Sequence, residues 1–314
     1  MMNQNKLPII SVIGPTSIGK TKCAIALAKI YPVEIISVDS TMIYKEMDIG
    51  TDKPDTTVLN ENIHHLIDIK YPNEKYNVGN FYYDSIKLIK NIHKRKKIPL
   101  FVGGTLMYFY QLFNGLNKLP PASSSERNFI NYLANMYGWD KIYTSLKYLD
   151  SAITSKINVN DHQRIQRSLE VYLMTGKPLS FFHSSTESLS DIYELITLKI
   201  SLNDRNKLHT IIEERTKKMF DSGLIDEVKY LKDKYELDLS YQSMKAIGYS
   251  HVMNFLYGKL NEKDLLQKVI FSTRQLAKRQ ITWLKKFPSK YQLDNASNIT
   301  KLIFNKIDKH LQYL

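Results

Sequence analysis

The sequence predicts an α/β protein with a P-loop NTPase-like parallel sheet, flanking helices and an inserted all-helical domain. Three observations support this fold class. Apolar, β-branched runs alternate with amphipathic helical stretches, which is typical of parallel strands joined by crossover helices. A glycine-rich loop follows the first apolar run. Strand-like runs disappear between about residues 117 and 191 and then return, which indicates a helical insertion.

The individual elements follow from local patterns. Residues 7–13 (LPIISVI) are apolar apart from one serine and stop at Gly14-Pro15, which predicts a buried strand. The same reasoning predicts, in chain order, a helix over 20–30, a strand over 34–38 that ends on Asp39, a helix over 78–93, a strand over 99–102 ahead of Gly103-Gly104, a fourth strand over 195–202 and a short strand over 291–293.

A chain of 314 residues is about two domains long. We predict a core formed by residues 1–117 and 192–314, and a helical domain formed by residues 118–191. Two linkers, PPASSSE at 120–126 and GKPLS at 176–180, separate helical stretches of the insertion. The polar stretch HSSTESLSD at 183–191 is the best candidate for a mobile loop.

Composition excludes several classes of protein. No run of 18 or more apolar residues is present, which excludes a transmembrane helix. The short polar N-terminal lead lacks the apolar region of a secretory signal, so we expect a cytoplasmic protein. The single cysteine, Cys23, excludes an internal disulfide and a zinc site made of several cysteines.

The net charge of +13 suggests a polyanionic partner. Of the 44 basic residues only eight are arginine, which leaves 44 − 8 = 36 lysines, and isoleucine, asparagine and tyrosine are abundant. An AT-rich genome would produce this pattern by codon drift. A solvated lysine surface without any partner therefore remains an alternative when the bulk charge alone is considered.

The loop GPTSIGKT fits the phosphate-binding pattern G-x-x-x-x-G-K-[ST] and lies between a predicted strand and a predicted helix. Backbone N–H groups at the helix N-terminus would cradle a phosphate chain, Lys20 would supply a cation, and Thr21 would supply a hydroxyl ligand for Mg²⁺. We therefore predict a bound phosphoanhydride, with a chance glycine-rich turn as the plainer alternative. The residues of this loop are Gly14, Pro15, Thr16, Ser17, Ile18, Gly19, Lys20 and Thr21.

Asp39 ends the second predicted strand, at the carboxyl edge of the sheet where ligands of parallel sheets bind. This position suits a general base that removes a proton from a hydroxyl or amine attacking a diphosphate ester. A helix cap or a metal ligand is the alternative role. The nearby HHLID at 64–68 lacks further metal ligands at matching spacing, so we expect structural hydrogen bonds there and no metal site.

Together these residues resemble the bacterial tRNA dimethylallyltransferases, also called tRNA isopentenyltransferases. The resemblance implies transfer of a dimethylallyl group from dimethylallyl diphosphate to the N6 amine of the adenosine 3′-adjacent to the anticodon in tRNA, with Mg²⁺ and release of diphosphate. Nothing demands an oligomer, so we expect a monomer. The matching blocks run nearly end to end: GPTSIGKT (14–21), ISVDSTMIYKEMDIGTDKP (36–54), HHLID (64–68), PLFVGGTLMYF (99–109), NDHQRIQRSLEV (160–171), residues 215–228, AIGY (246–249) and TRQLAKRQITWLKKF (273–287).

The resemblance also implies roles for single residues. Asp39 is implied as the general base, Arg215 as a cation beside the donor, and Thr105 as a contact of the target base, with a simple helix N-cap as the alternative for Thr105. The donor diphosphate would occupy the P-loop, with Mg²⁺ on Thr21. The residues implied to bind tRNA are Asp39, Ser40, Thr41, Met42, Thr105, Arg127, Gln163, Arg164, Ile165, Gln166, Arg167, Lys245, Ala246, Ile247, Gly248, Tyr249, Ser250, Lys278, Arg279, Gln280, Ile281, Thr282, Trp283, Leu284 and Lys285.

The chain departs from the family pattern at a few positions. Ile18 replaces a small polar residue in the loop, Ile211 replaces an arginine one turn before Arg215, and Lys245 and Ser250 replace arginines around AIGY. These changes leave the chemical residues intact and bear on the donor pocket and on RNA affinity.

Two segments are expected to bind RNA. Residues 265–293 contain seven Lys or Arg and no acid, and helical spacing places Arg274, Lys278 and Lys285 on one face. We expect this basic stripe to contact phosphates, with a solvated charged face as the alternative. Five of the eight arginines lie in family-matching RNA segments, and their retention against lysine drift suggests contact with phosphate or base edges: Arg127, Arg164, Arg167, Arg274 and Arg279.

Three other functions share parts of this pattern. An ATP-dependent small-molecule kinase would use the same loop and the same carboxylate, but it would not need the helical insertion or the acid-free helix. A second alternative transfers the allyl group to free adenine nucleotides. The third is an RNA-binding protein whose loop is only a nucleotide switch.

Overall fold

The protein is described here by a computed structural model, which covers residues 6–182, 187–202, 204–287 and 291–293. Two compact units are present: unit 1 comprises Met1–Phe113 with Ser188–Leu314, and unit 2 comprises Asn114–Glu187. The predicted insertion, 118–191, is displaced by four residues at each end from unit 2. Among the helices of the described ranges, none has both the length and the apolar character that a membrane span requires.

Unit 1 contains a six-stranded sheet with the order β3-β2-β4-β1-β5-β6, in which every described strand pair is parallel. The predicted fold class is confirmed, and the five predicted strands are present with ends shifted by two residues at most. Only the two-residue β3 was not predicted, because so short a run carries no periodic signal. The strands are β1 (Pro8–Ile13), β2 (Val33–Val38), β3 (His64–His65), β4 (Ile98–Gly103), β5 (Glu194–Ile200) and β6 (Tyr291–Leu293).

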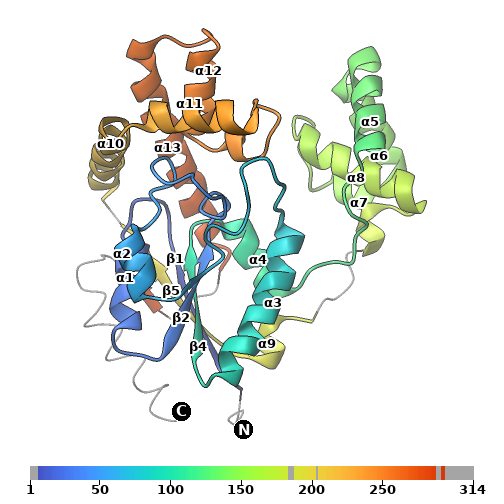
Figure 1. Cartoon of the computed structure of the whole chain (residues 1–314). Helices are drawn as coiled ribbons and strands as arrows, with labels where there is room; N and C mark the ends of the chain where they lie inside the picture. The colour runs from blue at the N-terminus through green and yellow to red at the C-terminus, as the bar shows by residue number, and fades with distance from the viewer. Residues whose placement is uncertain (1–5, 183–186, 203, 288–290, 294–314) are drawn as a thin grey trace. The chain divides into compact units, whose positions relative to one another are not determined.

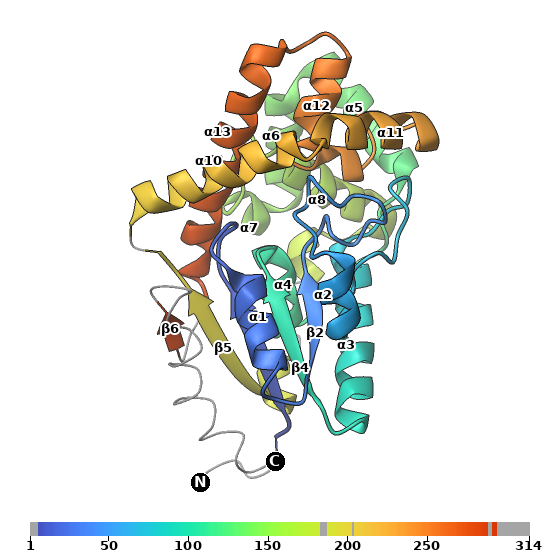
Figure 2. The ribbon, with the colours of Figure 1, turned by 60° about the vertical axis from the view of Figure 1, so that its left-hand side comes forward.

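Helices cover both faces of this sheet, with α1 on one face and α3 and α4 on the other (Figures 1 and 2). The helices α10 to α13 lie beyond the carboxyl ends of the strands (Figure 2). The helices of unit 1 are α1 (Lys20–Ala28), α2 (Thr56–Glu61), α3 (Val78–Lys94), α4 (Leu106–Asn114), α9 (Leu189–Ile192), α10 (Arg205–Asp221), α11 (Leu224–Tyr235), α12 (Tyr249–Leu256) and α13 (Glu262–Leu284).

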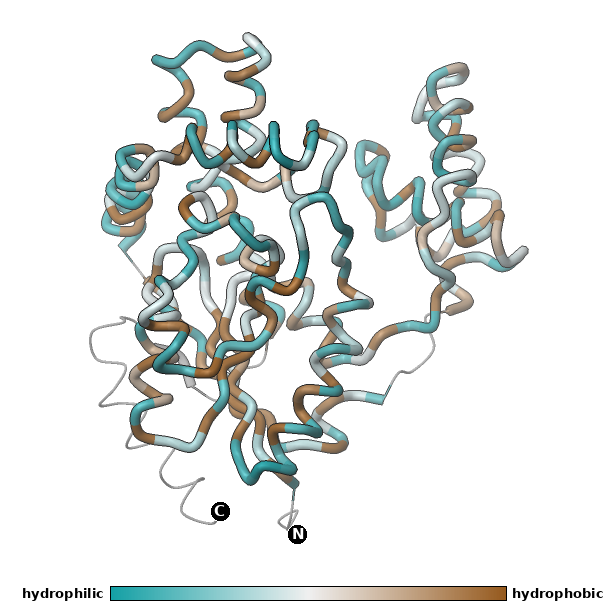
Figure 3. The backbone as a smooth tube through the Cα atoms, viewed as in Figure 1, coloured by the Kyte–Doolittle hydropathy of each residue, from teal (hydrophilic) through white to brown (hydrophobic). Residues whose placement is uncertain are grey.

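Strand alternation places two hydrophobic clusters of unit 1 on opposite faces of the sheet. In β1, Ile9 and Ile13 belong to the cluster that contains α3 and α4, whereas Ile10 and Val12 belong to the cluster that contains α1. Successive side chains of a strand point to opposite faces, so an apolar run of this kind is buried on both sides. Figure 3 shows the resulting concentration of hydrophobic residues along the central strands. The sheet is thereby a rigid support for the loops at its carboxyl edge.

The regular secondary structure described in unit 2 is all helical, and the unit has its own apolar core, which includes Ile130, Ile142, Leu146 and Ile165. Its helices are α5 (Ser124–Tyr137), α6 (Trp139–Leu149), α7 (Ser151–Thr154) and α8 (His162–Thr175), followed by a short 3-10 turn at Leu179–Phe182.

The expectation of a mobile loop at 183–191 is wrong for its C-terminal part. Leu189–Ile192 form α9, because Ser188 and Asp191 make a capping box and Leu189 is buried in the core of unit 1. Residues 183–186 lie outside the described residues.

Candidate active site

Three strand ends bring the candidate residues together at one edge of the sheet. The P-loop follows β1, Asp39 follows β2 and Gly104-Thr105 follows β4, and β4 pairs with both of the other strands. Gly103 permits this approach, since a Cβ atom there would lie only 2.1 Å from the carbonyl oxygen of Val38. Loops that follow adjacent parallel strands share the edge where α/β proteins bind ligands.

The P-loop has the backbone of an anion-binding turn. Ser17 and Gly19 adopt left-handed conformations, with φ of 63° and 87°, and Gly19 begins α1 without any side-chain cap. The first N–H groups of α1 therefore have no partner from a capping side chain, and they are oriented for an anion. Gly14 is required by close packing, because a Cβ atom there would lie 2.7 Å from the carbonyl oxygen of Ile200.

Lys20 lies inside this loop, where its Nζ donates to the carbonyl oxygen of Pro15 at 2.6 Å. Burial lowers the pKa of Lys20 to about 8; the carboxylate of Asp39 opposes this shift and the guanidinium of Arg215 adds to it. The amine is thus a desolvated cation that a bound phosphate would stabilise.

Arg215 of α10 reaches the opposite side of the P-loop. Its Nη1 donates to the hydroxyls of Thr16 at 2.6 Å and Ser17 at 3.1 Å, and its Nε lies 3.1 Å from the carboxylate of Asp52. Two donors of this guanidinium therefore contact neutral hydroxyls, which a phosphate oxygen could replace as acceptor. Sequence reasoning predicted Arg215, and the structure brings it to the loop.

Asp39 is held by the turn that follows β2. Its Oδ1 accepts from the Thr41 N–H at 2.8 Å, the Thr41 hydroxyl at 2.6 Å and the Met42 N–H at 3.3 Å. No residue among those described supplies a donor to Oδ2. The carboxylate is therefore oriented through one oxygen, and the other is available to a ligand.

Thr105 fixes the same turn from the next strand. Its hydroxyl accepts from the backbone N–H of Ser40 at 3.1 Å, and its own N–H donates to the carbonyl oxygen of Val38 at 3.2 Å. Thr105 immediately precedes α4, as the N-cap alternative required, but its side chain serves the β2 turn instead of capping the helix.

Gln280 of α13 is a site residue whose position was not foreseen. Its Oε1 accepts from the N–H of Thr16 at 2.9 Å and its Nε2 donates to the carbonyl oxygen of Gly104 at 2.8 Å. A single side chain thus joins the P-loop to the loop after β4. Gln280 was predicted only as one of several tRNA-binding residues of its helix, and no local pattern distinguishes it.

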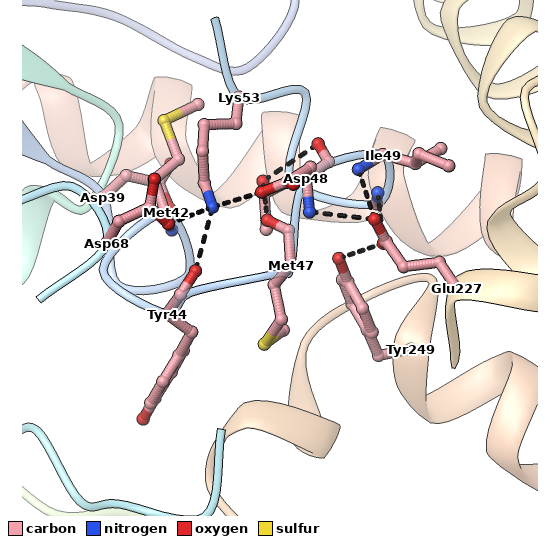
Figure 4. A network of polar contacts seen from close by, with 12 residues as sticks. Asp39, Met42, Tyr44, Met47, Asp48, Ile49, Lys53, Asp68, Glu227 and Tyr249 are labelled. Carbon is pink, nitrogen blue, oxygen red and sulfur yellow. Dashed lines mark hydrogen bonds and ion pairs between the residues drawn. The ribbon is translucent and has the colours of Figure 1, made fainter. Parts of the chain in front are cut away.

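A network of polar contacts holds the segment of residues 47–53 near Asp39 (Figure 4). The Nζ of Lys53, which is nearly inaccessible, contacts the carboxylates of Asp48 and Asp68, each at 2.5 Å, and the carbonyl oxygen of Tyr44 at 2.9 Å. Asp68 is tied to the Asp39 turn, because its N–H donates to the carbonyl oxygen of Met42 at 3.2 Å. This segment is therefore a structural part of the site.

The paired histidines have hydrogen-bonding roles, as expected. His65 Nε2 lies 2.7 Å from the carboxylate of Glu34, and His64 Nδ1 lies 2.8 Å from the carbonyl oxygen of Asn62. Glu34 is almost fully buried; burial opposes its ionisation, but hydrogen bonds from Arg95 and His65 overcome this effect and lower its pKa to about 2. Within the described ranges, no group of three His, Cys, Asp or Glu side chains could hold a metal ion.

The donor set at the P-loop nevertheless suits Mg²⁺. This ion typically takes one or two protein oxygens and completes its shell with water and substrate phosphates. Thr21, in the first turn of α1, offers a hydroxyl at the loop, and the carboxylate of Asp39 interacts electrostatically with the adjacent Lys20.

The predicted basic stripe on α13 needs a correction. Lys278, Arg279 and Lys285 are exposed, but Arg274 pairs with Glu213 of α10 at 3.0 Å. Residues 265–293 contain no acid, yet the fold supplies one from a helix that precedes them. Of the predicted tRNA-binding residues in this part of unit 1, Tyr249 and Leu284 are buried, so we leave their side chains out of the interface.

The insertion needs a similar correction. Arg127 and Arg167 both pair with the fully buried carboxylate of Glu170, at 3.2 and 3.0 Å, and Arg167 also donates to the carbonyl oxygen of Pro120 at 2.6 Å. Arg164 pairs with Asp161 at 3.3 Å on the surface. Arg127 and Arg167 thus have a structural role, because they neutralise a buried carboxylate. Ile165 is fully buried in the core of unit 2 and presents no side-chain atom to a ligand.

Ile18, a departure from the expected loop pattern, also has a structural explanation. Its side chain is only 6% exposed and belongs to the core cluster that contains Cys23, Ala24 and Ile200. An apolar residue at this position anchors the loop to the core and faces away from the phosphate site.

Most of the chain is similar to known proteins. Residues 42–287 match the model of a family described as IPP transferase. The tRNA dimethylallyltransferase of Coxiella burnetii (strain Dugway 5J108-111) is 42% identical over 287 residues, which cover 91% of this chain and 92% of that protein. The tRNA dimethylallyltransferase of Nitrosomonas eutropha is 38% identical over 289 residues, covering 92% and 91%.

Solved structures show the same likeness. The crystal structure of the full-length tRNA isopentenylpyrophosphate transferase from Bacillus halodurans superposes with a TM-score of 0.71 at 31% identity and covers 98% of both chains. A eukaryotic dimethylallyltransferase acting on tRNA superposes with a TM-score of 0.77 at 27% identity, covering 98% of this chain and 77% of that one.

Proposed function

The chain belongs to the IPP transferase family, and from this premise we propose that it transfers a dimethylallyl group from dimethylallyl diphosphate to tRNA. We further propose that the acceptor is the N6 amine of the adenosine 3′-adjacent to the anticodon. The observation that carries the proposal is the juxtaposition, at one sheet edge, of two cations without a buried counter-ion and one oriented carboxylate: Lys20, Arg215 and Asp39.

The two cations suit a diphosphate leaving group. Lys20 donates to a carbonyl oxygen and Arg215 donates to two hydroxyls, so an anion would replace neutral acceptors with charged ones. Donors held in place before the reaction stabilise the charge that develops on the departing diphosphate without reorganising. The bond that breaks joins the allylic carbon to oxygen, and both electrons leave with the diphosphate.

The carboxylate suits the acceptor. The N6 amine of adenine is a weak nucleophile because its lone pair is delocalised into the ring, so a base within hydrogen-bonding reach assists the attack. In our proposal the nitrogen forms a bond to the allylic carbon and its proton passes to Oδ2 of Asp39. Thr41 and Met42 orient the carboxylate through Oδ1, and Thr105 holds the turn.

Mg²⁺ would be held by the hydroxyl of Thr21 and by the diphosphate itself, and it would supply charge neutralisation for the leaving group. Gln280 has a positioning role in this proposal, since it keeps the P-loop at a fixed distance from the loop after β4.

We propose that the exposed basic side chains of Lys278 and Arg279 in α13, and of Lys285 at its C-terminal cap, contact the tRNA backbone. Gln163 and Arg164 are the exposed members of the predicted RNA-binding set on α8. The acceptor base must leave its stack to reach a carboxylate at the sheet edge, which is how other base-modifying enzymes gain access to their targets.

A single labelling experiment tests this function. The protein is incubated with Mg²⁺, radiolabelled dimethylallyl diphosphate and either unmodified tRNA or AMP, with the Lys20→Ala variant as the inactive control. We expect label in tRNA, at the adenosine next to the anticodon, and none in AMP. Label in AMP alone would identify a transferase of free nucleotides. In a parallel incubation that also contains ATP, consumption of ATP with no allyl transfer would identify a kinase.

A further inference from the structure

The segment that contacts Arg215 is fixed by a residue outside the P-loop. Glu227 of α11 accepts three consecutive backbone N–H groups of this segment: Oε2 accepts from Asp48 at 2.9 Å and from Ile49 at 2.7 Å, and Oε1 accepts from Gly50 at 3.1 Å (Figure 4). Charge-assisted hydrogen bonds of this kind are stronger than neutral ones. One side chain therefore determines where three successive peptide groups lie.

Tyr249, the first residue of α12, completes the arrangement. Its hydroxyl donates to Oε1 of Glu227 at 2.6 Å, and its side chain is fully buried. Burial, together with the neighbouring carboxylate, raises the pKa of Tyr249 well above its usual range, so the phenol remains a donor. The backbone of Gly50 is packed against this ring, because a Cβ atom on Gly50 would lie 2.5 Å from it.

The C-terminal half of the same segment contacts Arg215. The carbonyl oxygen of Thr51 accepts from Nη2 of Arg215 at 3.5 Å, and the carboxylate of Asp52 lies 3.1 Å from Nε. The turn is internally tied, since the Thr51 hydroxyl donates to the carbonyl oxygen of Met47 at 2.6 Å and the Asp52 N–H donates to that of Ile49 at 3.1 Å. A displacement of residues 48–50 would therefore move both acceptors of the guanidinium.

We propose that Glu227 and Tyr249 are positioning residues for Arg215, which they hold in place through the segment of residues 48–52. Neither residue contacts the P-loop in this arrangement; they set the acceptors that aim the guanidinium at Thr16 and Ser17. This inference rests on the proposed role of Arg215 in binding the donor diphosphate.

The test uses inorganic pyrophosphate with Mg²⁺ as the probe of the diphosphate site, and calorimetry on the full chain as the measurement. Glu227→Gln, which keeps the size of the side chain, should weaken pyrophosphate binding by about tenfold, because misplacing a group by a fraction of an ångström has effects of this order. Tyr249→Phe, which keeps the ring in the core, should cause a smaller loss in the same direction. Binding of tRNA should be unchanged in both variants.

Glu46→Gln is the matched control. Glu46 also joins the polypeptide near this segment to α11, through Lys234 at 2.8 Å and the Tyr235 hydroxyl at 3.2 Å, but none of its contacts leads to Arg215. This variant should bind pyrophosphate as the unmodified chain does. A general loosening of α11 would instead weaken binding in Glu46→Gln as well, and that result would overturn the inference.

A double-mutant cycle with Arg215→Gln identifies the route of the effect. If Glu227 acts through Arg215, adding Glu227→Gln to Arg215→Gln should cause no further loss of pyrophosphate affinity. Additive losses would mean that Glu227 acts independently of Arg215 and would refute the inference. A normal affinity of Arg215→Gln alone would instead refute the proposed role of Arg215, so the two failures are distinguishable.

Discussion

Arginines in two regions of the molecule have opposite environments. At the sheet edge of unit 1, Arg215 faces the hydroxyls of Thr16 and Ser17, and its carboxylate partner, Asp52, is exposed. In unit 2, Arg127 and Arg167 share the carboxylate of Glu170, which has no accessible surface. The first guanidinium can exchange a neutral acceptor for an anion, whereas the other two already neutralise a buried charge.

This difference shows that the burial of an arginine's partner indicates the role of that arginine better than the presence of the arginine in the sequence does. Removing a cation from a buried carboxylate leaves that charge without compensation, which is strongly unfavourable. Removing a cation from hydroxyls leaves groups that water can satisfy. We therefore expect substitutions at the sheet edge to change the reaction and substitutions around Glu170 to change stability.

The largest effect is expected at Asp39. Asp39→Ala should lower the single-turnover rate of allyl transfer by roughly 10²- to 10⁴-fold, the range for loss of a general base, and should leave tRNA affinity nearly intact. Rapid-quench measurement with labelled donor and saturating tRNA gives this rate.

Asp39→Asn is the sharper variant. Its side-chain oxygen can still accept from the N–H groups of Thr41 and Met42, so the turn is preserved while the base is lost. The Asn variant should be as slow as the Ala variant. If Asn restored most of the rate, Asp39 would have a role in the turn only.

The next effect concerns the charge of Lys20. Because its pKa in the free protein is about 8, affinity for pyrophosphate should fall by up to about tenfold per pH unit above pH 8, as binding must then be accompanied by protonation of the amine. Calorimetric titrations of the unmodified chain and of Lys20→Met between pH 7 and 9.5 separate this effect from ionisation of the ligand. An identical pH dependence in the two proteins would show that Lys20 does not contact the anion.

The same shift has a consequence for stability, and its sign is opposite to that of a stabilising ion pair. A lysine whose pKa is lower in the folded chain than in the unfolded chain disfavours folding while it is charged, and this cost decreases as the pH rises from about 8 to about 10.5. Lys20→Met should therefore unfold at a higher temperature than the unmodified chain at pH 7, by a margin that decreases toward pH 10.

The two regions also differ in how far the sequence alone could describe them. The P-loop, Asp39 and Arg215 were predictable because a spaced motif, a strand end and matching blocks mark them. Gln280 and Glu227 also lie in matching blocks, but no motif or strand end distinguishes their side chains from the neighbouring ones. Gln280 contacts Thr16 across 264 positions, and Glu227 contacts Asp48 across 179. Such contacts depend on how helices pack on the sheet edge, which no local pattern contains.

The ion pairs of Arg127 and Arg167 in unit 2 were not predicted, for a different reason. Arg167 and Glu170 are three positions apart on one helix, so their ion pair was visible in the sequence. What the sequence did not reveal was that Glu170 is buried and that Arg127 reaches it from α5. For Arg274 the partner, Glu213, comes from a helix 61 positions earlier, and the acid-free stretch was therefore a poor guide.

An intermediate effect, on stability, is expected at Glu170. Glu170→Gln should destabilise the chain by about 1–3 kcal/mol, because Arg127, Arg167 and the N–H of Ser123 lose a charged acceptor and both arginines are partly exposed to water. Chemical denaturation measures this change. Pyrophosphate affinity at the P-loop should be unchanged; a loss there comparable to that of Arg215→Gln would contradict the division between the two regions.

The smallest effect distinguishes free from paired cations on α13. Each phosphate contact contributes about one unit to the slope of log K against log salt concentration. Lys278→Ala and Arg279→Ala should each reduce the slope of tRNA binding by about one, since both side chains are exposed and the described residues supply no acidic partner to either.

Arg274→Ala should leave the slope nearly unchanged and lower stability instead, because Glu213 already neutralises its charge. Filter binding of tRNA at salt concentrations from about 50 to about 300 mM measures these slopes. Equal slope changes for Arg274 and Lys278 would mean that tRNA displaces Glu213 from Arg274, and an ion pair with a partly exposed carboxylate would then not be enough to tell a structural arginine from one that binds a ligand.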